Sequence, residues 1–109
     1  TQGVSSAASD VYKRQAYVYL LIEELTKAAV GMGFSESDAR VMVEQTFIGA
    51  TALLDASGEE PSELRRRVTS PKGTTERAVA VLQDAHLDRT FAQAADAALA
   101  RAKELAAGG

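Results

Sequence analysis

The feature that most limits how this chain can fold is the three- and four-residue spacing of its apolar side chains. Near the start, one helical face gathers Tyr17, Leu21, Leu25, Ala28 and Met32. Alanine, the best helix former, supplies 21 of the 109 residues, and only two prolines interrupt the chain. Signals for β-strands are nearly absent. The sequence therefore predicts an all-α fold.

We expect a helical bundle of about five helices. A capping box opens the second helix after Ser35, and Pro61 suits the first position of the third. The predicted helices run from about Ala16 to Met32, from after Ser35 to Ser57, from Pro61 to Arg67, from the next loop to about Ala85, and from Leu87 to Ala106.

The second predicted helix is apolar nearly all round, since Val41, Ile48 and Ala52 lie outside its main apolar stripe. A chain of this length has too few elements to cover every face of such a helix. The last helix adds a seven-residue repeat lined mostly with alanine, which suits tight packing. We therefore expect the bundle to interlock with a second subunit, as a homodimer.

Residues Thr1–Gln15 differ from the rest, because they are small and polar and show no sustained period. We expect a disordered or artefactual N-terminal segment over residues 1–15. Residues 16–109 then form one helical domain.

Charge and composition exclude several classes of function. A net charge of -3 argues against nucleic-acid binding, and the absence of cysteine with a single histidine argues against a metal site. The longest apolar run, Ala16–Ile22, is too short to span a membrane. No basic-then-apolar leader opens the sequence, so we expect a cytoplasmic location.

The loop Thr69–Thr75 is rich in hydroxyl groups and precedes a helix. A helix start presents free N–H groups and a positive dipole end, which attract a carboxylate or phosphate. The simpler interpretation is a helix connection in which Thr74 caps the following helix. Spacing alone leaves both interpretations open. The preceding basic run, Arg65–Arg67, is typical of a solvated helix end.

The same loop carries a family resemblance. Residues Val68–Thr75 read Val-Thr-Ser-Pro-Lys-Gly-Thr-Thr, which resembles the Val-Thr-Ser-Pro-Gly-Gly-Thr-Thr signature of pyrroline-5-carboxylate reductases. Ala16–Glu23 is similar to the start of the family's C-terminal domain, and Gln45-Thr46 with Gly49-Ala50 to its second helix. The resemblance covers Ala16 to about Leu105.

The resemblance implies a helical domain like the C-terminal domain of 6-phosphogluconate dehydrogenase, interlocked as a dimer, with five dimers often forming a decamer. The family reduces 1-pyrroline-5-carboxylate to L-proline with NADPH or NADH, which an N-terminal Rossmann domain binds. No complete dinucleotide fingerprint follows a strand here. We therefore expect a fragment that binds no cofactor alone and is inactive alone.

By resemblance, backbone N–H groups around Ser70, Lys72, Gly73 and Thr74 hold the substrate carboxylate, and the Thr75 hydroxyl lies near the imine nitrogen as the catalytic group. No metal is implied.

Two residues depart from the family pattern. Lys72 replaces the usual glycine and is strained if the backbone there needs a positive φ. Arg66 stands where many relatives have aspartate, which alters local capping.

Two other interpretations remain. The chain could be a stand-alone, non-catalytic α-helical dimerisation module. It could also be the helical half of another two-domain dehydrogenase, for which Lys27 is the one candidate catalytic lysine.

Overall fold

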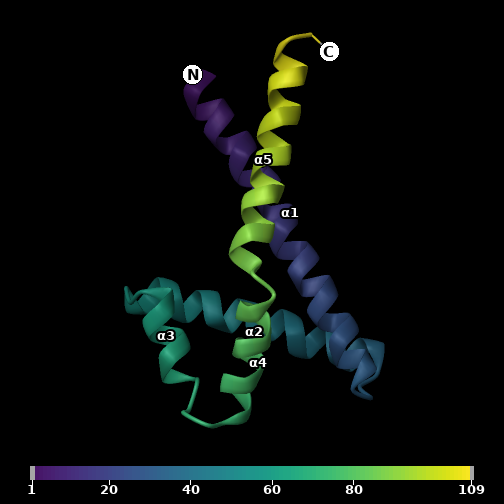
Figure 1. Ribbon diagram of the computed structural model, residues 1–109, viewed down its shortest axis with the longest axis vertical. Coiled ribbons are helices and arrows are strands. Elements are labelled where there is room, and N and C mark those ends of the chain that lie inside the picture. The colour runs from purple at the N-terminus through teal and green to yellow at the C-terminus, as the bar shows by residue number, and fades with distance from the viewer. Residues whose placement is uncertain (1, 109) are drawn as a thin grey trace. The chain divides into compact units, whose positions relative to one another are not determined.

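The computed structural model describes the backbone of residues 2–108 and the side chains of residues 14–108. This part of the chain contains five α-helices and no strand (Figure 1). The helices are α1 (Gln2–Gly31), α2 (Glu36–Ser57), α3 (Pro61–Arg67), α4 (Thr74–Asp84) and α5 (Leu87–Ala106). The all-α class and the number of helices are as predicted, and the bounds of α3 and α5 coincide with the predicted ones.

Helix α1 differs most from the prediction, because it begins at Gln2 and not near Ala16. The backbone of residues 2–15 is helical, and the expectation that residues 1–15 are a disordered or artefactual segment stays a prediction. Once a helix has formed, each added residue gains a hydrogen bond without a new nucleation cost. The segment contains no proline, so nothing in it blocks extension of α1 toward the N-terminus.

The C-terminus of α1 is closed by a Schellman motif around Gly33. The N–H of Phe34 donates to the carbonyl of Ala29 at 3.3 Å, and the N–H of Gly33 donates to Val30 at 3.0 Å. Gly33 has a φ of 111°, a conformation open to glycine but strained for other residues. This turn reverses the chain so that α2 can return along α1.

Helix α2 has a specific cap at each end. The Ser35 hydroxyl accepts the N–H of Asp38 at 3.2 Å, as the capping box predicts. At the other end Gly58 adopts a left-handed φ of 67° and donates to the carbonyl of Leu54 at 3.4 Å. Both ends therefore lie where the sequence places them.

The chain divides into two units, Thr1–Glu59 and Glu60–Gly109. In the first unit α1 packs against α2. The core of this contact is small: Ala39 is 0% exposed and Val43 is 6% exposed. Ile22, Thr26 and Ala29 of α1 are half-buried. A small residue such as alanine lets the two helix backbones approach closely.

Much of the apolar face predicted for α1 stays in solvent within a single chain. Leu25 is 47% exposed and Met32 is 80% exposed, and Leu21 is exposed as well. Most of the apolar stripe predicted for α1 thus lies outside its contact with α2. A contiguous exposed apolar surface of this kind is typical of a protein interface.

The second unit holds α3, α4 and α5, and α4 contacts α5. Among its described residues none is buried, and Phe91 and Leu105 of the predicted seven-residue repeat are exposed. His86 is the N-cap of α5, and its left-handed φ of 56° separates α4 from α5. The apolar face of α5 is therefore left uncovered by its own unit.

Candidate functional site

The loop between α3 and α4 first closes the end of α3. The N–H of Val68 donates to the carbonyl of Arg65 at 3.2 Å, and the N–H of Thr69 donates to Arg66 at the same distance. The Thr69 hydroxyl also donates to the Arg65 carbonyl, at 2.5 Å. These bonds satisfy carbonyls that a helix end otherwise leaves without partners. They also fix the point from which the loop departs.

Residues Ser70–Gly73 then form a tight turn. The N–H of Gly73 donates to the carbonyl of Ser70 at 3.0 Å, and Pro71 occupies the second position of the turn. Lys72, in the third position, has a φ of 62°. Proline followed by a residue with positive φ is the pattern of a type II turn.

The positive φ at Lys72 gives a physical reason for the glycine that the related signature carries at this position. A non-glycine residue in the left-handed region costs roughly 1–2 kcal/mol. The strain expected from a lysine at this position is therefore present in the structure, and the turn forms in spite of it.

Gly73 is favoured for a different reason, since its φ of -83° is open to any residue. A Cβ atom at this position would lie 3.1 Å from the carbonyl oxygen of Ser70 and 3.4 Å from its Cβ. A side chain at this position would therefore be in tight contact with Ser70, which would have to shift by a few tenths of an ångström. Gly73 therefore keeps the turn tight where the chain enters α4.

Glu76 joins the turn to α4. Its Oε1 accepts the N–H of Lys72 at 3.1 Å. The N-cap of α4 is Gly73, so Glu76 is the third helical residue and reaches back as a glutamate does in a capping box. Sequence reasoning did not single out Glu76, although its spacing from Gly73 is the signal that could have found it.

The interpretation of Thr74 as the N-cap of α4 is wrong, because Thr74 is the first residue inside the helix. Gly73 precedes it and offers no side chain for capping. Within residues 14–108, no hydrogen bond involves the amides or hydroxyls of Thr74 and Thr75. Both residues are exposed, so α4 presents open donors at its positive dipole end.

A surface hollow of about 310 Å³ adjoins the turn, lined by Arg65, Arg66, Thr69, Pro71 and Glu76. None of the five predicted site residues forms part of this lining. Among the described residues the guanidinium of Arg65 has no hydrogen-bond or ion-pair partner. The hollow thus combines a carboxylate with an available cation, whereas the sequence predicts only a solvated helix end for Arg65–Arg67.

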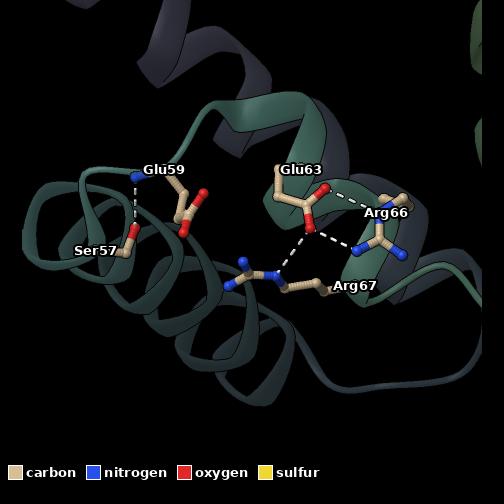
Figure 2. A network of polar contacts seen from close by, with 5 residues as sticks. All are labelled: Ser57, Glu59, Glu63, Arg66 and Arg67. Atoms are coloured by element: carbon tan, nitrogen blue, oxygen red, sulfur yellow. Dashed lines mark hydrogen bonds and ion pairs between the residues drawn. The ribbon is translucent and has the colours of Figure 1, made fainter.

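Arg66 does not cap the loop, because its side chain binds Glu63 within α3 (Figure 2). Arg66 Nε donates to Glu63 Oε2 at 2.9 Å, and Arg67 Nε donates to Oε1 at 3.2 Å. The hydrogen bond from Arg66 is the main reason why the pKa of Glu63 falls from 4.5 to about 2. The bond from Arg67 lowers it further, against the rise that partial burial causes.

The structure therefore gathers the predicted residues at one turn and helix start. The amides of Lys72 and Gly73 already have partners, whereas those of Thr74 and Thr75 are open. Open amides at a helix start can hold one anionic group, such as a carboxylate.

The described part of the chain has no candidate for two other kinds of site, a metal centre and a membrane span. Across the described side chains, no three histidine, cysteine, aspartate or glutamate residues lie close enough to share a metal ion. No helix in the described part of the chain has the length and apolar character needed to cross a membrane.

These features define an α-helical domain that exposes apolar faces and presents open backbone amides at the start of α4. The family model described as pyrroline-5-carboxylate reductase dimerisation matches residues 13–105. The chain belongs to this family. The match begins three residues before the predicted domain boundary at Ala16.

Curated relatives agree with this assignment. The chain is 43% identical over 91 residues to the pyrroline-5-carboxylate reductase of Pseudomonas aeruginosa, and 38% identical over 90 residues to pyrroline-5-carboxylate reductase 2 of Bacillus subtilis. These alignments cover 84% and 83% of the chain but only 33% and 32% of the relatives. The chain thus spans about a third of their length.

Among solved structures, a pyrroline-5-carboxylate reductase from Coxiella burnetii superimposes with a TM-score of 0.81 at 41% identity, over 84% of this chain and 34% of that one. The Plasmodium falciparum pyrroline carboxylate reductase with NADP bound gives a TM-score of 0.72 at 31% identity, over 76% of this chain and 32% of that one.

Proposed function

We propose that this chain is the dimerisation and substrate-loop domain of an enzyme that reduces 1-pyrroline-5-carboxylate to L-proline. The observation that carries the proposal is the turn Ser70–Gly73, which lies inside the family match and leads into the open amides of α4. Packing of helices alone does not call for such a loop. The alternative of a stand-alone dimerisation module leaves the turn without a role.

In this proposal the substrate carboxylate binds where the turn meets α4. Backbone N–H groups around Ser70, Lys72, Gly73 and Thr74 surround it; the N–H of Gly73 keeps its bond to the Ser70 carbonyl, and the others donate to the substrate carboxylate. The dipole of α4 favours the negative charge. The Thr75 hydroxyl lies on the same first turn of the helix, and in this proposal it forms a hydrogen bond with the imine nitrogen of the substrate. The loop thereby contributes orientation and charge complementarity to the reaction.

The hydride comes from NADPH or NADH, which the proposal assigns to a nucleotide-binding domain outside this chain. The Plasmodium falciparum relative, of which the chain matches 32%, is described with NADP bound, and this supports a nicotinamide cofactor for the family. The residues of this chain do not supply the redox chemistry. Their part is to hold the substrate in the orientation that accepts the hydride.

The proposal includes assembly as a homodimer, with five dimers forming a decamer, in the cytoplasm. The exposed apolar faces of α1, α2 and α5 support the dimer, since among the described side chains only Ala39 and Val43 are buried within one chain. Interfaces of obligate dimers resemble a domain core divided between two subunits.

A fusion protein tests the proposed activity. The complete chain would follow the nucleotide-binding domain of the Coxiella burnetii relative, in place of that enzyme's own helical domain. We expect oxidation of NADPH that depends on 1-pyrroline-5-carboxylate and yields L-proline. The nucleotide-binding domain alone is the control. A fusion that dimerises and binds NADPH but shows no turnover would favour the non-catalytic module.

A further inference from the structure

The place proposed for the substrate carboxylate already contains a carboxylate, that of Glu76. Its Oε1 accepts the N–H of Lys72 at 3.1 Å, and Lys72 is one of the residues whose amide the proposed function assigns to the substrate. Glu76 also lines the hollow beside the turn. An N–H group donates one strong hydrogen bond at a time, so the amide of Lys72 cannot donate fully to both carboxylates.

We infer that Glu76 competes with the substrate carboxylate and thereby sets the affinity of the site for its substrate. This inference rests on the proposed function. In the free protein Glu76 holds the amide of Lys72. When substrate binds, the Glu76 side chain turns away and the substrate carboxylate takes its place. Because Glu76 is exposed, its side chain has solvent to move into.

The turn has constraints on its shape besides Glu76. The hydrogen bond from Gly73 to Ser70 closes the turn at 3.0 Å, and Pro71 fixes the backbone at its second position. The close approach of Gly73 to Ser70 constrains it further. We therefore expect removal of the Glu76 side chain to free the amide of Lys72 while the turn remains.

Charge adds to the competition. Two carboxylates about 4 Å apart repel each other in water strongly enough to weaken binding roughly five-fold. Glutamine at position 76 removes this repulsion but keeps an oxygen that can accept the N–H of Lys72. Alanine removes both the charge and the acceptor. The two substitutions therefore separate repulsion from occupancy of the amide.

The test uses Glu76→Gln and Glu76→Ala in the fusion protein described above. We expect Glu76→Ala to lower the KM for 1-pyrroline-5-carboxylate about five-fold or more, Glu76→Gln to lower it less, and kcat to stay within two-fold. The matched control is Asp88→Asn, which makes the same charge change in the first turn of α5 and leaves the loop untouched. The control should leave both constants unchanged.

Hydrogen exchange of the Lys72 amide, followed by NMR on the 109-residue chain, should become faster in Glu76→Ala than in Glu76→Gln. An unchanged or raised KM in Glu76→Ala, with the unmodified fusion active, overturns the inference and makes Glu76 a support of the turn. Absence of turnover in the unmodified fusion counts instead against the proposed function, and the inference falls with it.

Discussion

The N–H of Gly73 donates to the carbonyl oxygen of Ser70 at 3.0 Å, and a side chain on Gly73 would have to occupy the space beside this same oxygen. A Cβ atom would lie 3.1 Å from it, which is closer than ordinary contact. The carbonyl of Ser70 therefore both closes the turn and crowds any side chain at position 73.

Gly73→Ala should therefore open the turn and destabilise the start of α4. Alanine is also a poor N-cap, so we expect a loss of about 0.5–1 kcal/mol in the free energy of unfolding. Denaturant unfolding measures this loss. Gly31→Ala is the control, because a Cβ at Gly31 meets nothing within 4 Å at the end of α1. Equal stability of the two variants would show that the close contact does not constrain the turn.

Lys72→Gly should have the opposite effect. Glycine relieves the strain of the 62° φ but loses more chain entropy on folding, so the net gain in the free energy of unfolding should be about 0.5–1 kcal/mol. Lys72→Ala removes the same charge and keeps a Cβ, so it should give no such gain. Thermal unfolding of both variants separates backbone strain from charge. A similar rise in Tm for both would attribute the effect to the charge.

The helices were predictable because their signals are local. Pro61 at the first position of α3 and the Ser35 cap of α2 each specify an end by a hydrogen-bonding need that the sequence displays. The N-terminal extension of α1 was not predictable from residue preferences, because the helix continues from a segment with a clear helical pattern into one without such a pattern. The exposed position of Leu25 depends on which face α2 covers, and periodicity alone does not show this.

At the candidate site the motif located the loop but not its hydrogen bonds. The sequence identified Lys72 as a departure from the related signature, and the turn shows the positive φ that makes this departure costly. The spacing of Glu76 from Gly73 suits a capping contact, but which amide Glu76 binds depends on how the turn folds back on the helix. The roles of Ser70 and Thr75 toward a substrate stay predictions.

Dimerisation should depend on the apolar face of α1. Leu25 is 47% exposed in the single chain, so Leu25→Glu should leave the helices intact but place a charge in the interface. We expect light scattering at micromolar concentration to give the mass of a dimer for the unmodified chain and of a monomer for Leu25→Glu, with equal helix content by circular dichroism. Gln45→Glu adds the same charge at another exposed position and should remain dimeric. A monomeric unmodified chain would contradict the proposal.

Thr75→Ala, placed in the fusion protein, should lower kcat/KM about ten-fold, which corresponds to the loss of one hydrogen bond to a charged group. The stability of the variant should change little, because no described residue binds the Thr75 hydroxyl. Thr75→Ser keeps the hydroxyl and should restore most of the activity. Thr90→Ala in α5 serves as the control. Unchanged kcat/KM in Thr75→Ala would remove this residue from the site.

The contact of Glu63 with Arg66 and Arg67 should make α3 sensitive to acid. The pKa of Glu63 is lowered from 4.5 to about 2, first of all by its hydrogen bond with Arg66, so the folded state favours the ionised carboxylate. Its contribution to stability is therefore fully present above pH 4.5 and is lost as the pH falls toward 2.

Glu63→Gln should flatten the dependence of Tm on pH within this window and leave the dependence above it unchanged. The effect should be small, since the pair lies at the surface, where solvent and salt screen charges. Glu104→Gln is the matched control, because it also removes an exposed contact with an arginine three residues away. If Tm falls with decreasing pH as steeply in Glu63→Gln as in the unmodified chain, the lowered pKa of Glu63 does not contribute to the stability of the fold.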